Sequence, residues 1–389
     1  MNTKETTDFY HTGNYERLPI EIIRGESCRL FDSDGKEYLD ALGGIAVNSL
    51  GYGHPIYLNA IKEQSEKFLH VSNFFYTKPQ AQLSQKLCEL SGLDKVFFCN
   101  SGAEANEAAI KLCRLYQSKN NNPECEFIFL ENAFHGRTMT NLAMGQHKHR
   151  KGFDPFPSGF KKAKFNDIDS VRKLITNKTG AIFCEPIQGE GGVTPASKEF
   201  LSELREICDE NNILLIFDEV QSGNGRTGKY FAFEHFGVSP DILTTAKGLG
   251  SGFPIGAMMA KEFVAKVFVP GSHGSTFGGN ALACAVGLAV SSEISRSEFL
   301  ENVRENGNYF LSQLKEKLAN NPRVKEIRGI GLFIGVELNE ESKAIMMKML
   351  ELGVLCSSTA ETVIRFVPPL IITKNEIGTV IDTLVSCLD

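Results

Sequence analysis

Two kinds of apolar pattern alternate along residues 55–290. Short runs of consecutive apolar residues, such as Leu214–Phe217, predict strands buried on both faces of a sheet. Between these runs, apolar residues recur at helical spacing. The predicted strands are Val96–Cys99, Glu126–Leu130, Ala181–Cys184, Leu214–Phe217 and Ile242–Thr245, and the predicted helices include Ala103–Tyr116, Ile168–Ile175 and Lys198–Glu210. This alternation predicts an α/β fold with a mostly parallel sheet.

The pattern changes toward both ends of the chain. Residues 1–30 are predicted to form an extended arm, and Cys28–Asp40 a hairpin that turns at Asp34-Gly35. Beyond about residue 295, strands and helices mix as in an α+β domain: Phe299–Leu318, Val324–Leu338, Lys343–Leu352, Val363–Phe366 and a final helix from Lys374. We therefore expect a large domain at 55–294 that binds the ligand. A smaller domain would combine the N-terminal arm region (1–54) with residues 295–389.

Composition narrows the class of protein. The net charge of −6 and the lack of a basic block argue against a nucleic-acid partner. No stretch approaches the roughly 18 apolar residues of a membrane helix, and the polar N-terminus has no apolar signal core. The ten cysteines include no C-x-x-C pair, which indicates neither a zinc ribbon nor a disulfide framework. These features predict a cytoplasmic protein with reduced thiols.

A lysine and a carboxylate follow two consecutive strands in the predicted sheet. Asp218 ends the strand that begins at Ile213, and Lys247 follows Ile242–Thr245 and opens a Gly-rich turn. Consecutive βα units bring such strand ends to one crevice, where open α/β sheets bind ligands. Pyridoxal phosphate needs a lysine, a carboxylate for its ring nitrogen and a phosphate site, so this pair predicts that cofactor. Taken alone, Asp218 beside Glu219 is better explained as a turn or capping carboxylate, and only the pairing with Lys247 favours a cofactor role.

A phosphate site is predicted at Asn100-Ser101-Gly102, where a strand runs directly into a helix. The free N–H groups at a helix start favour anions. The alternative is an ordinary cap, with Ser101 paired to Glu104 in a capping box. Val220 lies two residues after Asp218, so on a strand both side chains share a face and Val220 could pack against a bound ring.

Other local patterns give weaker signals. Gly223–Tyr230 nearly matches the phosphate-binding loop of nucleotide hydrolases, but Tyr230 stands where that loop needs Ser or Thr. Gly248, Gly250 and Gly252 lack dinucleotide-fingerprint spacing. His147 and His149 have no third ligand nearby in the sequence, so no metal site is predicted.

Seven motifs in order resemble those of the class III (ω-amino-acid) aminotransferases of fold type I, from about residue 15 to the C-terminus. They are Asn100–Glu107, Phe134–Thr138, Glu185–Gly192, Phe217–Gln221, Thr245–Lys247, Gly274–Gly278 and Ile364–Pro369. The resemblance implies a fold type I pyridoxal-phosphate transferase. It has a large domain with a mostly parallel central sheet and a small α+β domain from both chain ends.

The resemblance also implies roles for individual residues toward pyridoxal phosphate. Lys247 would form the Schiff base and then act as general base. The remaining implied cofactor contacts are Asp218 to the ring nitrogen, Gln221 to the phenolic oxygen, Phe134 and Val220 to the two ring faces, and Ser101, Gly102 and Ala103 to the phosphate. The partner subunit's Thr276 would complete the phosphate site, which implies a homodimer with shared active sites.

For the substrates, the resemblance implies a switch between two carboxylate-binding guanidinium groups. Arg137 would hold the distal carboxylate of an ω-amino donor while Glu190 pairs with Arg365. When 2-oxoglutarate enters, Glu190 would release Arg365 to bind its second carboxylate. For either arginine alone, a structural ion pair is the alternative.

Donor choice is inferred from Gly44, where ornithine aminotransferases carry a Tyr. The missing side chain leaves room for an Nα-acylated donor such as N2-acetylornithine, with Ser275 and Asn73 lining the pocket. We therefore expect amino transfer to 2-oxoglutarate in arginine biosynthesis. Succinylornithine, N-succinyl-diaminopimelate, ornithine and GABA remain alternative donors. Rival classes are an aminomutase or decarboxylase with the same cofactor, a nucleotide-binding protein using Lys229, and a regulator, which would carry a fused DNA-binding segment.

Overall fold

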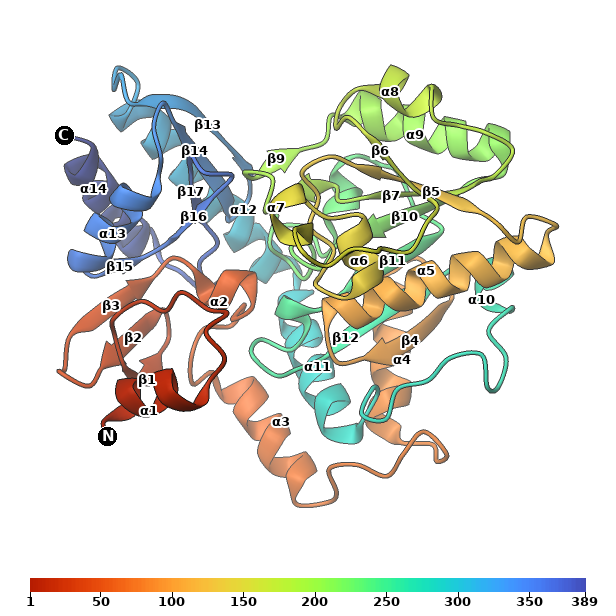
Figure 1. The fold of residues 1–389 in the computed structure, drawn as a ribbon. Helices are drawn as coiled ribbons and strands as arrows, with labels where there is room; N and C mark the ends of the chain where they lie inside the picture. Colours follow the sequence, from red (N-terminus) through yellow and green to blue (C-terminus); the bar gives the residue numbers. More distant parts are fainter.

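A seven-stranded sheet forms the centre of the molecule in the computed structural model, which describes all of residues 1–389 (Figure 1). Its strand order is β4-β12-β11-β10-β7-β5-β6, and only β12 runs antiparallel to its neighbours. The mostly parallel sheet is thus confirmed. The strands are β4 (Lys95–Cys99), β5 (Glu126–Leu130), β6 (Phe160–Ala163), β7 (Thr179–Cys184), β10 (Leu214–Asp218), β11 (Ile242–Thr245) and β12 (Gly256–Ala260).

Alternate residues of each central strand enter two different cores. On β5, Phe127 and Phe129 belong to a core shared with helix α5 (Gly102–Lys119), whereas Ile128 and Leu130 face the larger core on the other side of the sheet. The larger core also receives residues of α4 (Lys78–Ser91), α9 (Lys198–Asn211) and α11 (Ala281–Ile294). Burial on both faces explains why these strands are continuous apolar runs.

Shorter elements connect the sheet strands. They are α3 (Pro55–Ser65), α6 (Met139–Ala143), α7 (His147–Arg150), α8 (Ile168–Arg172), β8 (Ile187–Gln188), β9 (Thr194–Pro195), the 3₁₀ helices η1 (Ala232–His235) and η2 (Lys247–Leu249), and α10 (Glu262–Ala265). The sequence pattern did not predict β6 or β12. The β12 segment, Gly-Ala-Met-Met-Ala, has neither β-branched residues nor aromatic ones to favour a strand.

The two ends of the chain meet beside the central sheet (Figure 1). Strand β15 (Val354–Leu355) pairs in parallel with β3 (Glu37–Asp40), extending the sheet β1-β2-β3-β15. A second sheet has the order β13-β14-β17-β16. The remaining elements are β1 (Ile22–Glu26), β2 (Arg29–Asp32), α2 (Gly43–Ala46), α12 (Ser297–Lys317), β13 (Val324–Ile330), β14 (Phe333–Leu338), α13 (Lys343–Glu351), β16 (Ser357–Thr359), β17 (Val363–Phe366) and α14 (Lys374–Leu388). The domain boundaries at residues 55 and 295 stay a prediction.

The N-terminal arm is not wholly extended, so that prediction was wrong for residues 3–10. Helix α1 (Thr3–Tyr10) forms there because Asn2 and Glu5 make a capping box, each side chain bonding the other residue's backbone N–H. The predicted hairpin is confirmed: β2 pairs antiparallel with β3, and Gly35 takes a φ of +83° in the turn.

Candidate active site

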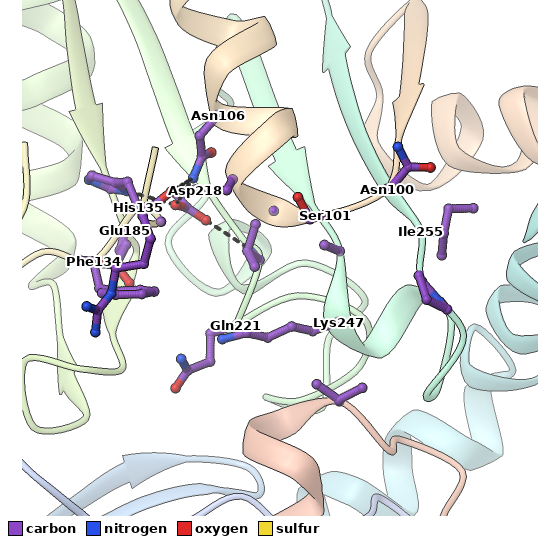
Figure 2. Close-up of a pocket in the computed structure, with 18 of the residues that line it drawn as sticks. Asn100, Ser101, Asn106, Phe134, His135, Glu185, Asp218, Gln221, Lys247 and Ile255 are labelled. Carbon is purple, nitrogen blue, oxygen red and sulfur yellow. Dashed lines mark hydrogen bonds and ion pairs between the residues drawn. The ribbon is translucent and has the colours of Figure 1, made fainter. Parts of the chain in front are cut away.

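Lys247 lies in a cavity of about 400 Å³ at the carboxyl ends of the parallel strands (Figure 2). Strand β11 ends at Thr245, and Lys247 then takes a φ of +44°, a left-handed conformation that is costly for a residue with a side chain. The cavity is lined by Val47, Asn100, Ser101, Gly102, Ala103, Asn106, Phe134, His135, Gly136, Arg137, Glu185, Asp218, Val220, Gln221, Ala246, Lys247, Gly252, Phe253, Pro254 and Ile255.

Burial makes the Lys247 amine easier to deprotonate. Desolvation lowers the pKa of Lys247 to about 8, although the negative charge of Glu190 opposes the shift. A neutral amine is the form that attacks an aldehyde. The position and the lowered pKa therefore suit Lys247 to covalent attachment of a carbonyl compound.

We expect covalent capture of pyridoxal phosphate by the cofactor-free protein to speed up as the pH rises through about 8. An exposed lysine would show this rise only near its ordinary pKa of about 10.4. Borohydride trapping followed by mass spectrometry, repeated from pH 6 to 10, would measure the rate. Lys229→Arg, a change outside the cavity, should leave the pH profile unaltered. A midpoint near 10 would contradict the lowered pKa.

Asp218 is held in one orientation by three hydrogen bonds (Figure 2). Its Oδ2 atom accepts from His135 Nδ1 at 2.7 Å and from Asn106 Nδ2 at 2.8 Å. Its Oδ1 atom accepts from the backbone N–H of Val220 at 3.0 Å. Strand β10 ends at Asp218, so Val220 reaches the cavity through a turn. The prediction that Val220 shares a strand face with Asp218 is therefore wrong.

The N-terminus of α5 borders the same cavity. Ser101 caps the helix, accepting the N–H of Glu104 at 3.2 Å, while the Glu104 carboxylate accepts the N–H of Asn100 at 2.7 Å. Ser101 is thus the N-cap, but the predicted capping box is incomplete, because Glu104 bonds Asn100 and not Ser101. The cap leaves the N–H groups of Gly102 and Ala103 without intrahelical partners, and the phosphate site stays a prediction. A Cβ at Gly102 would stand 2.6 Å from Val220 Cγ1, so only glycine allows this close approach.

Arg365 enters from β17 and lies buried beside the cavity. Its guanidinium donates to Glu190 Oε1 at 2.5 Å, to Gln221 Oε1 at 2.9 Å and to Ser357 Oγ at 3.1 Å. Burial by itself would raise the pKa of Glu190, but the Arg365 charge lowers this pKa to about 2. The pair is therefore fully ionised near neutral pH.

Arg137 lines the cavity without an ion pair. Its guanidinium carbon lies 5.6 Å from the centroid of the Phe134 ring, and the side chain is exposed. The structure thus contains one guanidinium open to a ligand carboxylate and another, Arg365, paired with Glu190.

Five predicted site residues do not line this cavity in the single chain: Arg365 and its partner Glu190, and also Thr276, Ser275 and Gly44. Thr276 is exposed, and Ser275 Oγ bonds Asn100 Nδ2 at 3.3 Å. Gly44 is exposed, with a φ of +63°, and an added Cβ would lie 2.9 Å from Asn48 Nδ2. Backbone conformation as well as space therefore favours glycine at position 44.

Sequence reasoning gave no role to His135, Asn106 or Glu185, although all three lie within the quoted motifs. Each is buried at the cavity. Glu185 Oε2 accepts the N–H of Phe134 at 3.1 Å, and burial, together with the charge of Asp218, raises the pKa of Glu185 well above its usual range. A sequence feature that could have indicated a role for Asn106 is its position as a polar residue on the buried side of the Ala-rich helix α5.

The cavity has the donor set that pyridoxal phosphate needs: a buried lysine, a carboxylate with a free lone pair, and helix N–H groups for the phosphate. The segment Gly223–Tyr230 lacks the helix that a nucleotide-binding loop requires, because only the 3₁₀ turn η1 follows it. Tyr230, at the position that needs Ser or Thr, is buried and its hydroxyl donates to Ser291 Oγ. No cluster of three or more His, Cys, Asp or Glu side chains could hold a metal ion. None of the helices combines the length and apolar character needed to cross a membrane.

Comparison with known proteins gives consistent similarities. The family model "Aminotransferase class-III" matches residues 10–388. The chain is 52% identical to the acetylornithine aminotransferase of Methanocaldococcus jannaschii, over 98% of this chain and 95% of that protein. It is 46% identical to the succinylornithine transaminase of Yersinia pseudotuberculosis, over 96% and 94%. The ornithine aminotransferase structure from Toxoplasma gondii superposes with a TM-score of 0.95 at 34% identity, over 99% and 94%.

Proposed function

We propose a donor, an acceptor and residue roles for this chain, which belongs to the class III aminotransferase family and is a pyridoxal-phosphate-dependent aminotransferase. The proposed reaction moves the ω-amino group of N2-acetylornithine to 2-oxoglutarate, giving N-acetylglutamate 5-semialdehyde and glutamate, as in arginine biosynthesis. The observation that carries it is the pair of guanidinium groups near Lys247, one open (Arg137) and one masked by Glu190 (Arg365).

In this proposal Lys247 moves the proton. Pyridoxal phosphate, when bound, supplies an electron sink for the bond that breaks at the amine-bearing carbon. The Lys247 amine, neutral above a pKa of about 8, accepts the proton from that carbon at Nζ and later delivers it. Asp218 would hold the protonated ring nitrogen through a carboxylate oxygen. Phe134 and Val220 would pack on the ring, and Gln221 would contact its phenolic oxygen.

The two arginines and Glu190 explain how one cavity accepts substrates of different charge. Arg137 binds the distal carboxylate of either substrate through its planar guanidinium. Glu190 neutralises Arg365 while the ω-amino donor is bound, because that donor has no carboxylate next to its reacting carbon. For 2-oxoglutarate, Arg365 exchanges Glu190 for the substrate's second carboxylate. Glu190 is only partly buried, so it can turn toward solvent.

We expect Arg365→Ala to lower kcat/KM for 2-oxoglutarate about 10- to 100-fold, from the loss of a charged hydrogen-bonding partner. The donor half-reaction should change much less, because Glu190 occupies Arg365 in that half. Single-turnover kinetics of each half-reaction would measure the two effects separately. Arg328→Ala, which removes another arginine that pairs with glutamates, is the matched control. Equal loss in both halves would contradict the switch.

The donor is tested by absorption of the cofactor-loaded protein. We expect N2-acetylornithine to bleach the long-wavelength absorption band of the lysine-bound cofactor faster than ornithine or GABA does. Adding 2-oxoglutarate should then restore this band. The 52% identity to an acetylornithine aminotransferase over nearly the whole length of both chains supports this donor. If ornithine or GABA bleaches the band fastest, the cofactor chemistry stands and the donor assignment with Gly44 is wrong.

An acyl group other than acetyl is the second candidate. The 46% identity to a succinylornithine transaminase supports it. Succinylornithine and N-succinyl-diaminopimelate belong in the same absorption series, and a faster reaction with either would replace the acetylated donor.

A homodimer is part of the proposal. Three consecutive aromatic residues, Phe74, Phe75 and Tyr76, are 92%, 64% and 107% exposed, an unusual apolar surface for a monomer. Asn73, just before them, bonds the carbonyl oxygens of Ser275 and Gly278 and so ties this strip to the loop of Thr276. A second copy covering the strip could place the partner subunit's Thr276 at the phosphate site.

The ten free cysteines support the proposal of a cytoplasmic location, because thiols stay reduced there.

We expect Phe75→Glu with Tyr76→Glu to convert the dimer to a 42.9 kDa monomer that releases its cofactor faster. Charges buried in an interface without partners oppose association. Light scattering would give the mass and dialysis followed by absorption the cofactor release. Leu352→Glu alters another exposed apolar residue, directly after α13, and should leave the mass unchanged. A double variant that stays dimeric would remove this strip from the interface.

A further inference from the structure

Asn106 joins three separate segments of the chain around Asp218 (Figure 2). It projects from α5 and is only 1% exposed. Its Nδ2 atom donates to Asp218 Oδ2 at 2.8 Å and to the carbonyl oxygen of His135 at 2.8 Å. Its Oδ1 atom accepts from the Thr244 hydroxyl on β11 at 2.7 Å. All three hydrogen bonds that this amide makes are directed at the surroundings of one carboxylate.

Two groups that can only accept determine which way the amide faces. Because the Asp218 carboxylate and the His135 carbonyl oxygen carry no proton, the amide NH₂ must point toward them, and the Thr244 hydroxyl then donates to the amide oxygen and holds it in place. Flipping the amide would place its oxygen against the Asp218 carboxylate, and two acceptors would then face each other without a proton. The donor is therefore fixed before any ligand binds.

A count of lone pairs shows what this fixed donor does to Asp218. Each carboxylate oxygen can accept about two hydrogen bonds. Oδ2 already has two, from His135 and Asn106, whereas Oδ1 has one, from Val220 N–H. Oδ1 thus keeps the free acceptor position. Without Asn106, Oδ2 would regain an open position and the carboxylate could rotate between two acceptor arrangements.

We propose that Asn106 is a positioning residue that holds Asp218 with Oδ1 free for the ring nitrogen of pyridoxal phosphate. The inference rests on the proposed role of Asp218. The same helix start presents the Gly102 and Ala103 N–H groups, about one turn before Asn106. One helix therefore positions both the N–H groups proposed to bind the phosphate and, through Asn106, the carboxylate proposed to bind the ring nitrogen. The helix thereby fixes the distance between these two binding groups.

The test measures cofactor binding by the cofactor-free protein, without turnover. Dissociation constants are compared for pyridoxal phosphate and for its analogue with carbon in place of the ring nitrogen. For Asn106→Leu we expect roughly tenfold weaker binding of pyridoxal phosphate, the effect of one charge-assisted hydrogen bond, and unchanged binding of the analogue. Equal weakening of both ligands would overturn the proposal, because damage to α5 does not distinguish the ring nitrogen.

Two further variants keep the result interpretable. Gln117→Leu removes a buried amide on the same helix, one that bonds the Gly180 carbonyl at 2.9 Å, and it should not change the ratio of the two dissociation constants. Thr244→Val releases the amide while keeping Asn106, and should weaken pyridoxal phosphate selectively by roughly threefold, as for one neutral hydrogen bond. An unchanged ratio in Thr244→Val would contradict the orientation argument even if Asn106→Leu does not fold.

Asp218→Asn separates failure of this inference from failure of the proposed function. If Asp218→Asn binds both ligands with an unchanged ratio, Asp218 does not contact the ring nitrogen and the proposed role fails with the inference. If Asp218→Asn changes the ratio but neither Asn106→Leu nor Thr244→Val does, the role of Asp218 stands and only the positioning role of Asn106 is refuted.

Discussion

Replacing Lys247 by alanine is expected to lower turnover by about 10⁴-fold or more, because one side chain serves as both the covalent anchor and the general base. The cofactor should still bind, held by the helix N–H groups and by Asp218 without a covalent bond. Loss of the protein-linked absorption band, with free aldehyde recovered after denaturation, would show this. Steady-state amino transfer from N2-acetylornithine would give the rate.

The matched control for that variant is Lys229→Ala. Lys229 belongs to the segment that resembles a nucleotide-binding loop, and it does not line the cavity. Its loss should leave amino transfer near the unaltered rate. Normal turnover by Lys247→Ala would overturn the assignment of the reacting lysine, and loss of turnover in Lys229→Ala alone would revive the nucleotide interpretation.

Replacing Asp218 by asparagine is expected to slow the proton-transfer step about 10²- to 10³-fold, the usual size of effect when one preorganised electrostatic group is removed. A neutral amide does not keep the ring nitrogen protonated, so less charge can be drawn from the breaking bond. Single-turnover bleaching with a deuterated donor isolates this step. Thermal unfolding of the variant would check that its fold is intact.

The neighbouring carboxylate provides a control. Glu219 is buried as well, but its oxygens accept from the N–H groups of Ala232 and Phe233 and from the Ser222 hydroxyl, away from the cavity. Burial raises the pKa of Glu219 to about 7 despite these bonds. Glu219→Gln should therefore alter stability more than proton transfer. An unaffected proton-transfer rate in Asp218→Asn would refute its proposed role.

Much of the central sheet was predictable from periodicity. Strands β5 and β11 have the predicted bounds, and α5 and α9 extend the predicted helices by a few residues. Double-faced burial requires uninterrupted apolar runs, and such runs are visible in one dimension. Strand β12 was missed because its Ala and Met residues have no strand preference and pair only through their neighbours β4 and β11.

Motifs predicted the candidate site residues but not the groups that hold Asp218. Lys247 and Asp218 could be paired from two consecutive strand ends, since parallel strands deliver their carboxyl ends to one crevice. The bonds from Asn106 and His135 to Asp218 span 112 and 83 residues, and no local pattern encodes them. Gly44 was interpreted as room for a substrate, whereas the structure also shows a left-handed backbone there.

By itself, then, the sequence determined the α/β class, the family resemblance and the residue types available for the chemistry, because these depend on short-range pattern and spacing. The resemblance also implied the pairing of Arg365 with Glu190, which the structure shows. Only the tertiary structure decided that Asn106 and His135 occupy one oxygen of Asp218 while the other keeps a free position. These features depend on side chains from distant segments competing for the same few hydrogen-bond positions in a buried site. Burial makes each such position costly to leave unfilled, and the packing of the sheet, α5 and β17 determines which group fills it.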